Sequence, residues 1–191
     1  MREQRNPAEG STGQPEQELI ERVINIKRIS KVMKGGKRMR ISAVVVVGDG
    51  RGQVGLGHGK ALEVAAAVRK AGVRARKDMT RIAVKGNTIP HETEGKHGAS
   101  RVLVKPAAPG TGLIACPQVR AVLEAAGLRD ALSKAYGSRN HYNTARATIT
   151  ALARLRTIEQ VAAARNKPIS HFVDTRGEGE SAEGHAGQEL D

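Results

Sequence analysis

The sequence predicts an α+β protein of two small domains with a polar tail at each end. Three observations support this prediction. Short strand-like apolar patterns alternate with longer helix-like ones along residues 19–170. A stretch rich in turn formers, residues 85–100, divides that region into two segments, each able to pair a sheet with one or two helices. Residues 1–18 and 171–191 are polar and glycine-rich, so we expect both tails to be disordered.

The first domain, residues 19–85, is predicted to open with three antiparallel strands. Apolar residues between Val23 and Ile29 indicate the first strand, and the sequence KGGKR supplies the turn that follows it. The second strand, MRISAVVVVG, ends in the turn GDGRG, and the third strand is QVGLGHG. Glycine supplies the positive φ that a tight turn between antiparallel strands requires.

A helix of small and basic residues is predicted to follow the third strand. Within KALEVAAAVRKAGVRARK the apolar residues recur at helical spacing, and most arginines and lysines fall on the other side. The predicted apolar face consists of Leu62, Ala65, Ala66, Val68 and Val73. The sequence MTRIAVKG is consistent with a fourth strand.

The second domain, residues 86–170, is predicted to combine strands with three helices. SRVLVKPA indicates a strand, and the loop APGTG separates it from a helix that begins at Pro117 and stops at Gly127. LRDALSKAYGS fits a strand or a helix, and we favour a strand ending at Tyr136. Asn143 is the expected N-cap of a helix in TARATITALARLR, and TIEQVAAARNK is a last short helix.

The charge of the chain favours a polyanionic partner, either nucleic acid or an acidic membrane surface. The chain has 32 Lys and Arg against 19 Asp and Glu. Residues 1–18 and 174–191 hold three of these basic and ten of these acidic residues, so residues 19–173 carry 29 against 9, a net charge of +20. With two tyrosines, one phenylalanine and no tryptophan, the chain has few rings for base stacking. We therefore expect contacts mainly to phosphates and sugars.

Catalysis and metal binding find little support. The single cysteine, Cys116, excludes an internal disulfide framework and a cysteine-rich zinc site, and we expect it to be a small, partly buried residue. His91 and His97 lie six residues apart, which is not the zinc-ligand spacing. We expect no enzyme activity, cofactor, metal or small-molecule substrate. Without a long apolar run or a signal-peptide pattern, we expect a soluble, cytoplasmic protein with no membrane association.

The glycines from Gly50 to Gly55 have the G-x-G-x-x-G spacing of a dinucleotide-binding loop. Such a loop requires a helix directly after the third glycine and an acidic residue about 20 positions later. Here the helical pattern begins too late and alanine stands at the acid's position, so we favour a hairpin. Gly55, Gly57 and Gly59 then share one face of the third strand. That face admits either an RNA backbone or a packed helix, and both alternatives stay open.

Basic residues gather around the turns of the first domain. SKVMKGGKRMR concentrates five cations about a glycine pair, and cations on a hairpin tip can follow a phosphate backbone. Two further cations stand at the ends of the glycine-rich strand. The residues expected to contact RNA are Lys31, Lys34, Gly35, Gly36, Lys37, Arg38, Arg40, Arg51, Gly55, Gly57, Gly59 and Lys60.

Long stretches of both domains resemble one family. GGKRMRISAVVVVGDGRGQVGLGHGKALEVAAAVRKA is similar to the signature region of the bacterial S-five family of ribosomal proteins. PGTGLIACPQVRAVLEAAG and KAYGSRNHYNTARAT are similar to the C-terminal domain of that family. The resemblance implies an N-terminal domain related to double-stranded-RNA-binding domains and a C-terminal α/β domain of two layers.

The resemblance also implies a function and partners. The family is a structural constituent of the small (30S) ribosomal subunit that binds 16S rRNA, supports subunit assembly and contributes to translational accuracy. Its partners are the S-four and S-eight proteins and messenger RNA (mRNA) where mRNA enters the subunit. The residues that resemble the loop near the spectinomycin site are Ile29, Ser30 and Lys31. Those that resemble the contact with S-four are Gly110, Thr111, Gly112 and Arg120.

Overall fold

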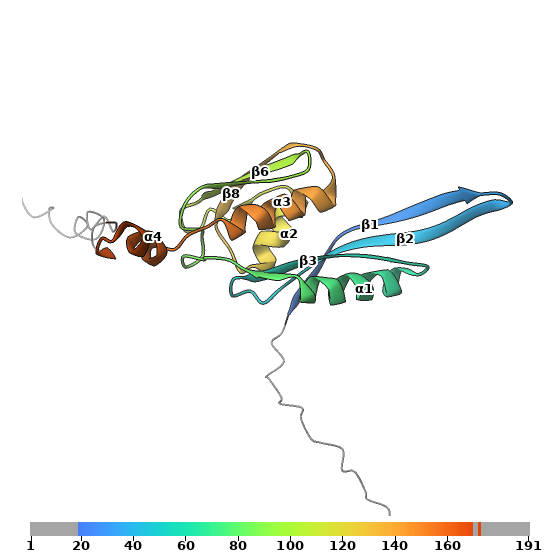
Figure 1. Cartoon of the computed structure of the whole chain (residues 1–191), viewed down its shortest axis with the longest axis horizontal. Coiled ribbons are helices and arrows are strands. Elements are labelled where there is room, and N and C mark those ends of the chain that lie inside the picture. The colour runs from blue at the N-terminus through green and yellow to red at the C-terminus, as the bar shows by residue number, and fades with distance from the viewer. Residues whose placement is uncertain (1–18, 170–171, 173–191) are drawn as a thin grey trace, which may run out of the picture.

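The computed structural model describes residues 19–169 and residue 172, which form two four-stranded sheets and four helices (Figure 1). This confirms the α+β class. The expected disordered tails lie outside the described residues, apart from residue 172. The elements of the first domain are β1 (Ile20–Met33), β2 (Gly36–Gly48), β3 (Gln53–Ala61), α1 (Val64–Lys77) and β4 (Met79–Arg81).

Strands β1 and β2 form a long antiparallel hairpin, as predicted. The sheet order is β1-β2-β3-β4, and the pairing of β2 with β3 begins only at Ile41. The outer part of the hairpin is therefore two-stranded, and Figure 1 shows it projecting from the body of the protein. A two-residue turn at Lys34 and Gly35 closes it, and Gly35 has a positive φ of +87°, which glycine adopts without steric cost. The glycines with dinucleotide-loop spacing, Gly50 to Gly55, fall on the β2–β3 turn and β3, so they belong to a hairpin.

The four consecutive valines of β2 are buried on both faces of the sheet. Because side chains alternate along a strand, Val45 and Val47 pack against α1, while Val44 and Val46 join a core on the opposite face. All four are at most 8 % exposed. The first sheet is therefore an inner layer of the protein, covered on each side by helices.

The glycines of β3 lie against the backbone of α1. A Cβ placed on Gly57 would come within 3.0 Å of the Ala71 carbonyl oxygen, a distance that real Cβ atoms essentially never show. A Cβ on Gly55 or Gly59 would meet other carbonyl oxygens of α1 equally closely. The packed helix is thus the alternative that the structure shows. The expectation that RNA approaches these three glycines through their bare face is wrong, because α1 fills it.

The same close approach determines which side of α1 is buried. The buried residues are small ones: Ala67, Ala71, Gly72 and Ala75. The predicted apolar face is only partly right: Val68 packs against the core on this side, but Leu62 precedes the helix and is 76 % exposed, and Val73 is 53 % exposed. Larger side chains do not fit between two backbones in close contact, so the glycines rather than the largest apolar residues set the rotation of the helix.

The second domain has a mixed sheet of order β5-β6-β8-β7, in which β7 runs parallel to β8. Its elements are β5 (Thr93–His97), β6 (Ser100–Pro106), β7 (Leu113–Ile114), α2 (Pro117–Ala125), β8 (Ala131–Gly137), α3 (His141–Ala153) and α4 (Ile158–Arg165). The start of α2 at Pro117 and the strand assignment of β8 are confirmed.

Three features of this domain differ from the prediction. Strand β5 lies within the turn-rich stretch, where Gly95 lets α3 approach: a Cβ there would come within 3.0 Å of the Ala147 carbonyl oxygen. The N-cap of α3 is Asn140 rather than Asn143, and its side chain accepts hydrogen bonds from the backbone N–H groups of Tyr142 and Asn143. Short strand β7 was not predicted.

One continuous core joins the two domains. Valines of β2, with Val54 and Leu56 of β3, pack with apolar residues of α2, α3 and the second sheet. Two backbone hydrogen bonds of 3.1 Å strengthen this junction: the N–H groups of Gly50 and Gly52 donate to the carbonyls of Ala125 and Ala126. The layers are α1, the first sheet, α2 with α3, and the second sheet (Figure 1). The outer hairpin is the part of the first domain that this stack leaves free.

Candidate nucleic-acid interface

The register of the first sheet places most of the predicted RNA-binding cations on one face. Directly opposed residues of neighbouring strands share a face. Lys31 lies opposite Arg38, Ile29 opposite Arg40, and Lys27 opposite Ser42, which in turn lies opposite Lys60. Val44, two residues after Ser42, faces the shared core, so this is the side of the sheet toward the second domain. We name the cations of this side the basic face: Lys27, Lys31, Arg38, Arg40 and Lys60.

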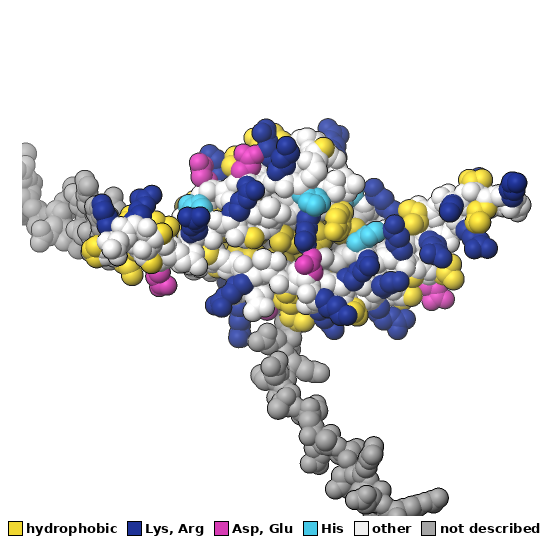
Figure 2. All heavy atoms as spheres, in the orientation of Figure 1, with side chains coloured by type: hydrophobic (Ala, Val, Ile, Leu, Met, Phe, Trp, Pro, Cys, Tyr) yellow, Lys and Arg dark blue, Asp and Glu magenta, His cyan; other side chains and the backbone are white. Residues whose placement is uncertain are grey.

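Among the described residues, no cation of the basic face forms a salt bridge. The salt bridges among the described residues involve other cations, and every residue of the hairpin from Lys27 to Arg40 is exposed. Figure 2 shows lysine and arginine side chains following the hairpin to its tip. Cations held in a row without partners are available to bind phosphate groups.

Other predicted residues lie apart from the basic face. Lys37 is paired with Val32 and lies on the opposite face with Arg28, while Lys34 is in the turn. Arg51 is in the β2–β3 turn, at the other end of β2, where Asp49 accepts a hydrogen bond from its N–H. The three residues that resemble the antibiotic-proximal loop lie in strand β1 and not in a loop; Ile29 and Lys31 are on the basic face and Ser30 is on the opposite face.

Lys27 was not predicted from the sequence. It lies four residues before Lys31, on the same face, and the period of two along a strand is the signal that identifies it. The register then shows which side this is, because Lys27 lies opposite Ser42.

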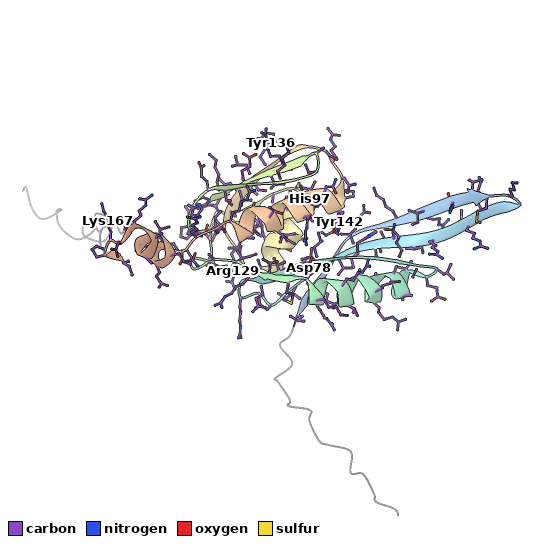
Figure 3. The ribbon with its side chains drawn as sticks, in the orientation of Figure 1. Asp78, His97, Arg129, Tyr136, Tyr142 and Lys167 are labelled. Carbon is purple, nitrogen blue, oxygen red and sulfur yellow. The ribbon has the colours of Figure 1, made fainter. Side chains whose placement is uncertain are left out.

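A polar cleft of about 280 Å³ lies at the base of the hairpin, between the two domains. Its lining residues are Asn25, Lys27, Ser42, Val44, His58, Asn140, His141 and Tyr142. The His58 Nε2 and Ser42 Oγ atoms are 2.7 Å apart and share a hydrogen bond. The Tyr142 ring lies 5.9 Å from the His58 ring and 6.3 Å from the His97 ring, centroid to centroid. Figure 3 shows Tyr142 and His97 beside the base of the hairpin.

The surroundings of His58 lower its pKa from the ordinary value of 6.5, chiefly through burial and further through the nearby Lys60 and Arg74. The unfolded chain therefore takes up this proton at a higher pH than the native protein does, so His58 contributes a loss of stability as the pH falls below about 6.5. We expect His58→Gln, which keeps a hydrogen-bonding partner for Ser42, to lose less stability than the wild type between pH 7 and pH 5. Urea unfolding at both pH values measures this, and equal losses would contradict it.

The four residues that resemble the S-four contact lie together at the start of α2. Gly110–Gly112 forms a loop in which both glycines have positive φ, +86° and +75°. The Gly112 N–H donates to Asp130 Oδ1 at 2.8 Å, and Arg120 Nη2 donates to the Leu113 carbonyl at 2.8 Å. Asp130 is only 5 % exposed, so a buried carboxylate holds the loop in place. No pattern in the sequence indicates this role of Asp130.

Metal binding, membrane spanning and the single cysteine concern other parts of the protein. Among residues 19–169 and 172, no group of three or more His, Cys, Asp or Glu is placed to hold a metal ion. In the same part of the chain, each helix is too short or too polar to cross a membrane. Cys116 is the N-cap residue of α2 and is partly buried against the core, as expected.

Two family models match the chain. The model for ribosomal protein S5, N-terminal domain, matches residues 19–83, and the model for ribosomal protein S5, C-terminal domain, matches residues 95–165. With the α+β fold, these matches define a structural protein of the small ribosomal subunit. The chain belongs to the ribosomal protein S5 family. Membership implies association with ribosomal RNA in the ribosome of the cytoplasm, in a family not known for enzymes.

Proposed function

We propose that this chain binds 16S rRNA through the basic face of its hairpin, and that it thereby supports assembly of the small subunit. The alignment of five cations by the strand register is the observation that carries the proposal. Residues two apart on a strand are separated by about 7 Å, so several of these cations can contact one RNA strand in succession. The contacts are to phosphate, which suits a hairpin without aromatic residues.

We further propose that the chain contributes to translational accuracy through the S-four protein. The Gly110–Gly112 loop and Arg120 support this proposal, because Gly110 and Thr111 are exposed while Asp130 holds the loop through Gly112 and the Leu113 carbonyl holds the Arg120 side chain beside it. Three further parts of the proposal rest on family membership alone. They are contact with the S-eight protein, contact with mRNA where it enters the subunit, and proximity of Ile29–Lys31 to the spectinomycin site.

Two double variants of equal charge test the RNA-binding role. Lys31→Ala with Arg38→Ala removes a cross-strand pair from the basic face, and Arg28→Ala with Lys37→Ala removes two cations from the opposite face. We expect the first double variant to bind 16S rRNA more weakly. Each phosphate contact contributes roughly 0.7–0.9 to the slope of log K against log salt, so loss of two contacts should lower the magnitude of that slope by about 1.5. The second should change the slope by less than half as much.

Filter binding of refolded 16S rRNA across a salt series provides the measurement. Equal effects of the two double variants would show that charge alone, and not the face, matters. An unchanged slope in the first variant would exclude phosphate contacts by this pair.

A further inference from the structure

The basic face does not end at the hairpin but leads into the cleft at its base. Lys27 and Ser42 are opposed residues of the hairpin, and Lys27 belongs both to the basic face and to the lining of the cleft. Asn25 and His58, two residues further along their strands, line it as well. An RNA strand that follows the cations from the tip therefore reaches this cleft without leaving the charged surface.

The lining of the cleft is complementary to a nucleotide. It contains a lysine, two asparagines, a serine, two imidazoles and a phenol ring, and no aspartate or glutamate. No hydrogen bond within the described residues uses the Asn25 side chain. Gln118 Nε2 contacts His141 Nδ1, so the Nε2 atom of His141 is left to bind a ligand. The Asn140 side-chain oxygen caps α3, so its amide N–H groups remain as donors.

The size of the cleft limits what it can hold. Its volume of about 280 Å³ lies just below the range of roughly 300–1,000 Å³ that is usual for small-molecule sites. One nucleotide suits this volume, whereas two paired strands do not. Tyr142 supplies the aromatic ring that unpaired bases commonly stack on in proteins that bind single strands.

We propose that the cleft between the base of the hairpin and the start of α3 receives one unpaired nucleotide of the bound RNA, with its phosphate at Lys27 and its base against Tyr142. The proposal rests on the proposed binding of RNA by the basic face and adds a second kind of contact to it. An aromatic contact of this kind also discriminates a bulged or looped strand from a continuous duplex.

His58 provides an independent readout in the wild-type protein. Burial together with Lys60 and Arg74 lowers its pKa, and Lys27 and His141 also line the cleft around it. A phosphate in the cleft would offset the repulsion by these cations and raise the pKa of His58. NMR titration of the imidazole, with and without RNA, measures this change.

The binding test uses the full chain and two RNA duplexes that are identical except that one carries a single bulged 2-aminopurine. We expect the bulged duplex to bind roughly tenfold more tightly, within the range measured for stacking of one base. Tyr142→Leu, which keeps apolar volume against the core, should abolish this preference. Tyr136→Leu is the matched control, because Tyr136 is an exposed tyrosine on β8, on the far side of the second domain (Figure 3); it should retain the tenfold preference.

Each outcome decides the proposal. Loss of the preference in Tyr142→Leu alone, with quenching of 2-aminopurine fluorescence in the wild type, supports it. Equal binding of the two duplexes overturns it and leaves RNA binding by the basic face intact, whereas binding of neither duplex overturns both. If polyglutamate displaces the bulged nucleotide and raises the pKa of His58 more than the RNA does, the cleft is a site for an acidic peptide instead. Should Tyr142→Leu fail to fold, an unchanged pKa of His58 with the bulged duplex would overturn the proposal.

Discussion

Gly57→Val is expected to lower the free energy of unfolding by about 3 kcal/mol or more, at the upper end of the effects of overpacking. A side chain at this position meets the backbone of α1 at Ala71 and Ala75, not a flexible side-chain end. The helix can make room only by moving off the sheet, which separates Val45 and Val47 from their neighbours on that face. Urea unfolding followed by far-UV circular dichroism measures the loss.

Gly72→Ala is the matched control for this prediction. Gly72 belongs to α1 itself, and a Cβ there would lie 3.4 Å from a carboxylate oxygen of Glu21, which is a flexible side chain. Because alanine is favoured over glycine in a helix by up to about 1 kcal/mol, this variant should be as stable as the wild type or more stable. If Gly57→Val and Gly72→Ala shift the urea midpoint alike, the close contact of β3 with α1 does not have the stabilising role described above.

Leu123→Ala is expected to destabilise both domains at once, by about 2–5 kcal/mol. Leu123 in α2 is fully buried in the core that the first sheet shares with the second domain. A cavity at this position removes contacts on both sides, so amide protection in β2 and in β6 should fall together. Hydrogen exchange resolved by segment measures both losses in one experiment.

Leu132→Ala provides the comparison for that result. Leu132 in β8 is 37 % exposed, so its truncation should change stability by only about 0.5 kcal/mol, as at other surface positions. Loss of protection in β6 alone after Leu123→Ala would mean that the domains unfold separately. In that case the shared core would not couple them.

Features that depend on local chemistry were predictable from the sequence. The hairpin follows from apolar strand patterns on both sides of a glycine turn, and α2 follows from Pro117 at its start and Gly127 after its end. The two glycine-dependent packing arrangements were not predictable in detail. At β3 the sequence did not decide whether RNA or a helix packs against the glycines. At β5 the presence of Gly95 among turn-forming residues led to the prediction of a turn where the structure has a strand. In both cases the deciding fact is the distance between two backbones, which no local pattern contains.

The candidate site also has parts that were predictable from the sequence and parts that were not. Individual cations of the hairpin were predicted from their density, but their division into two faces depends on the pairing of β1 with β2 across the turn. The cleft was not predicted at all, because its residues come from β1, β2, β3 and α3 and meet only when the domains pack together. Tyr142 and His58 lie 84 positions apart in the chain, and neither stands in a pattern that indicates binding.

The shared core also gives the hairpin a mechanical property. Strand β2 runs without interruption from the tip at Gly36 to Gly48, beside the hydrogen bonds that join Gly50 and Gly52 to the end of α2. Its 13 residues span about 43 Å, so a rotation of about one degree at its inner end displaces the tip by about 0.7 Å. If the strand moves as a rigid rod, a small rotation where β2 meets the end of α2 is therefore magnified at the tip.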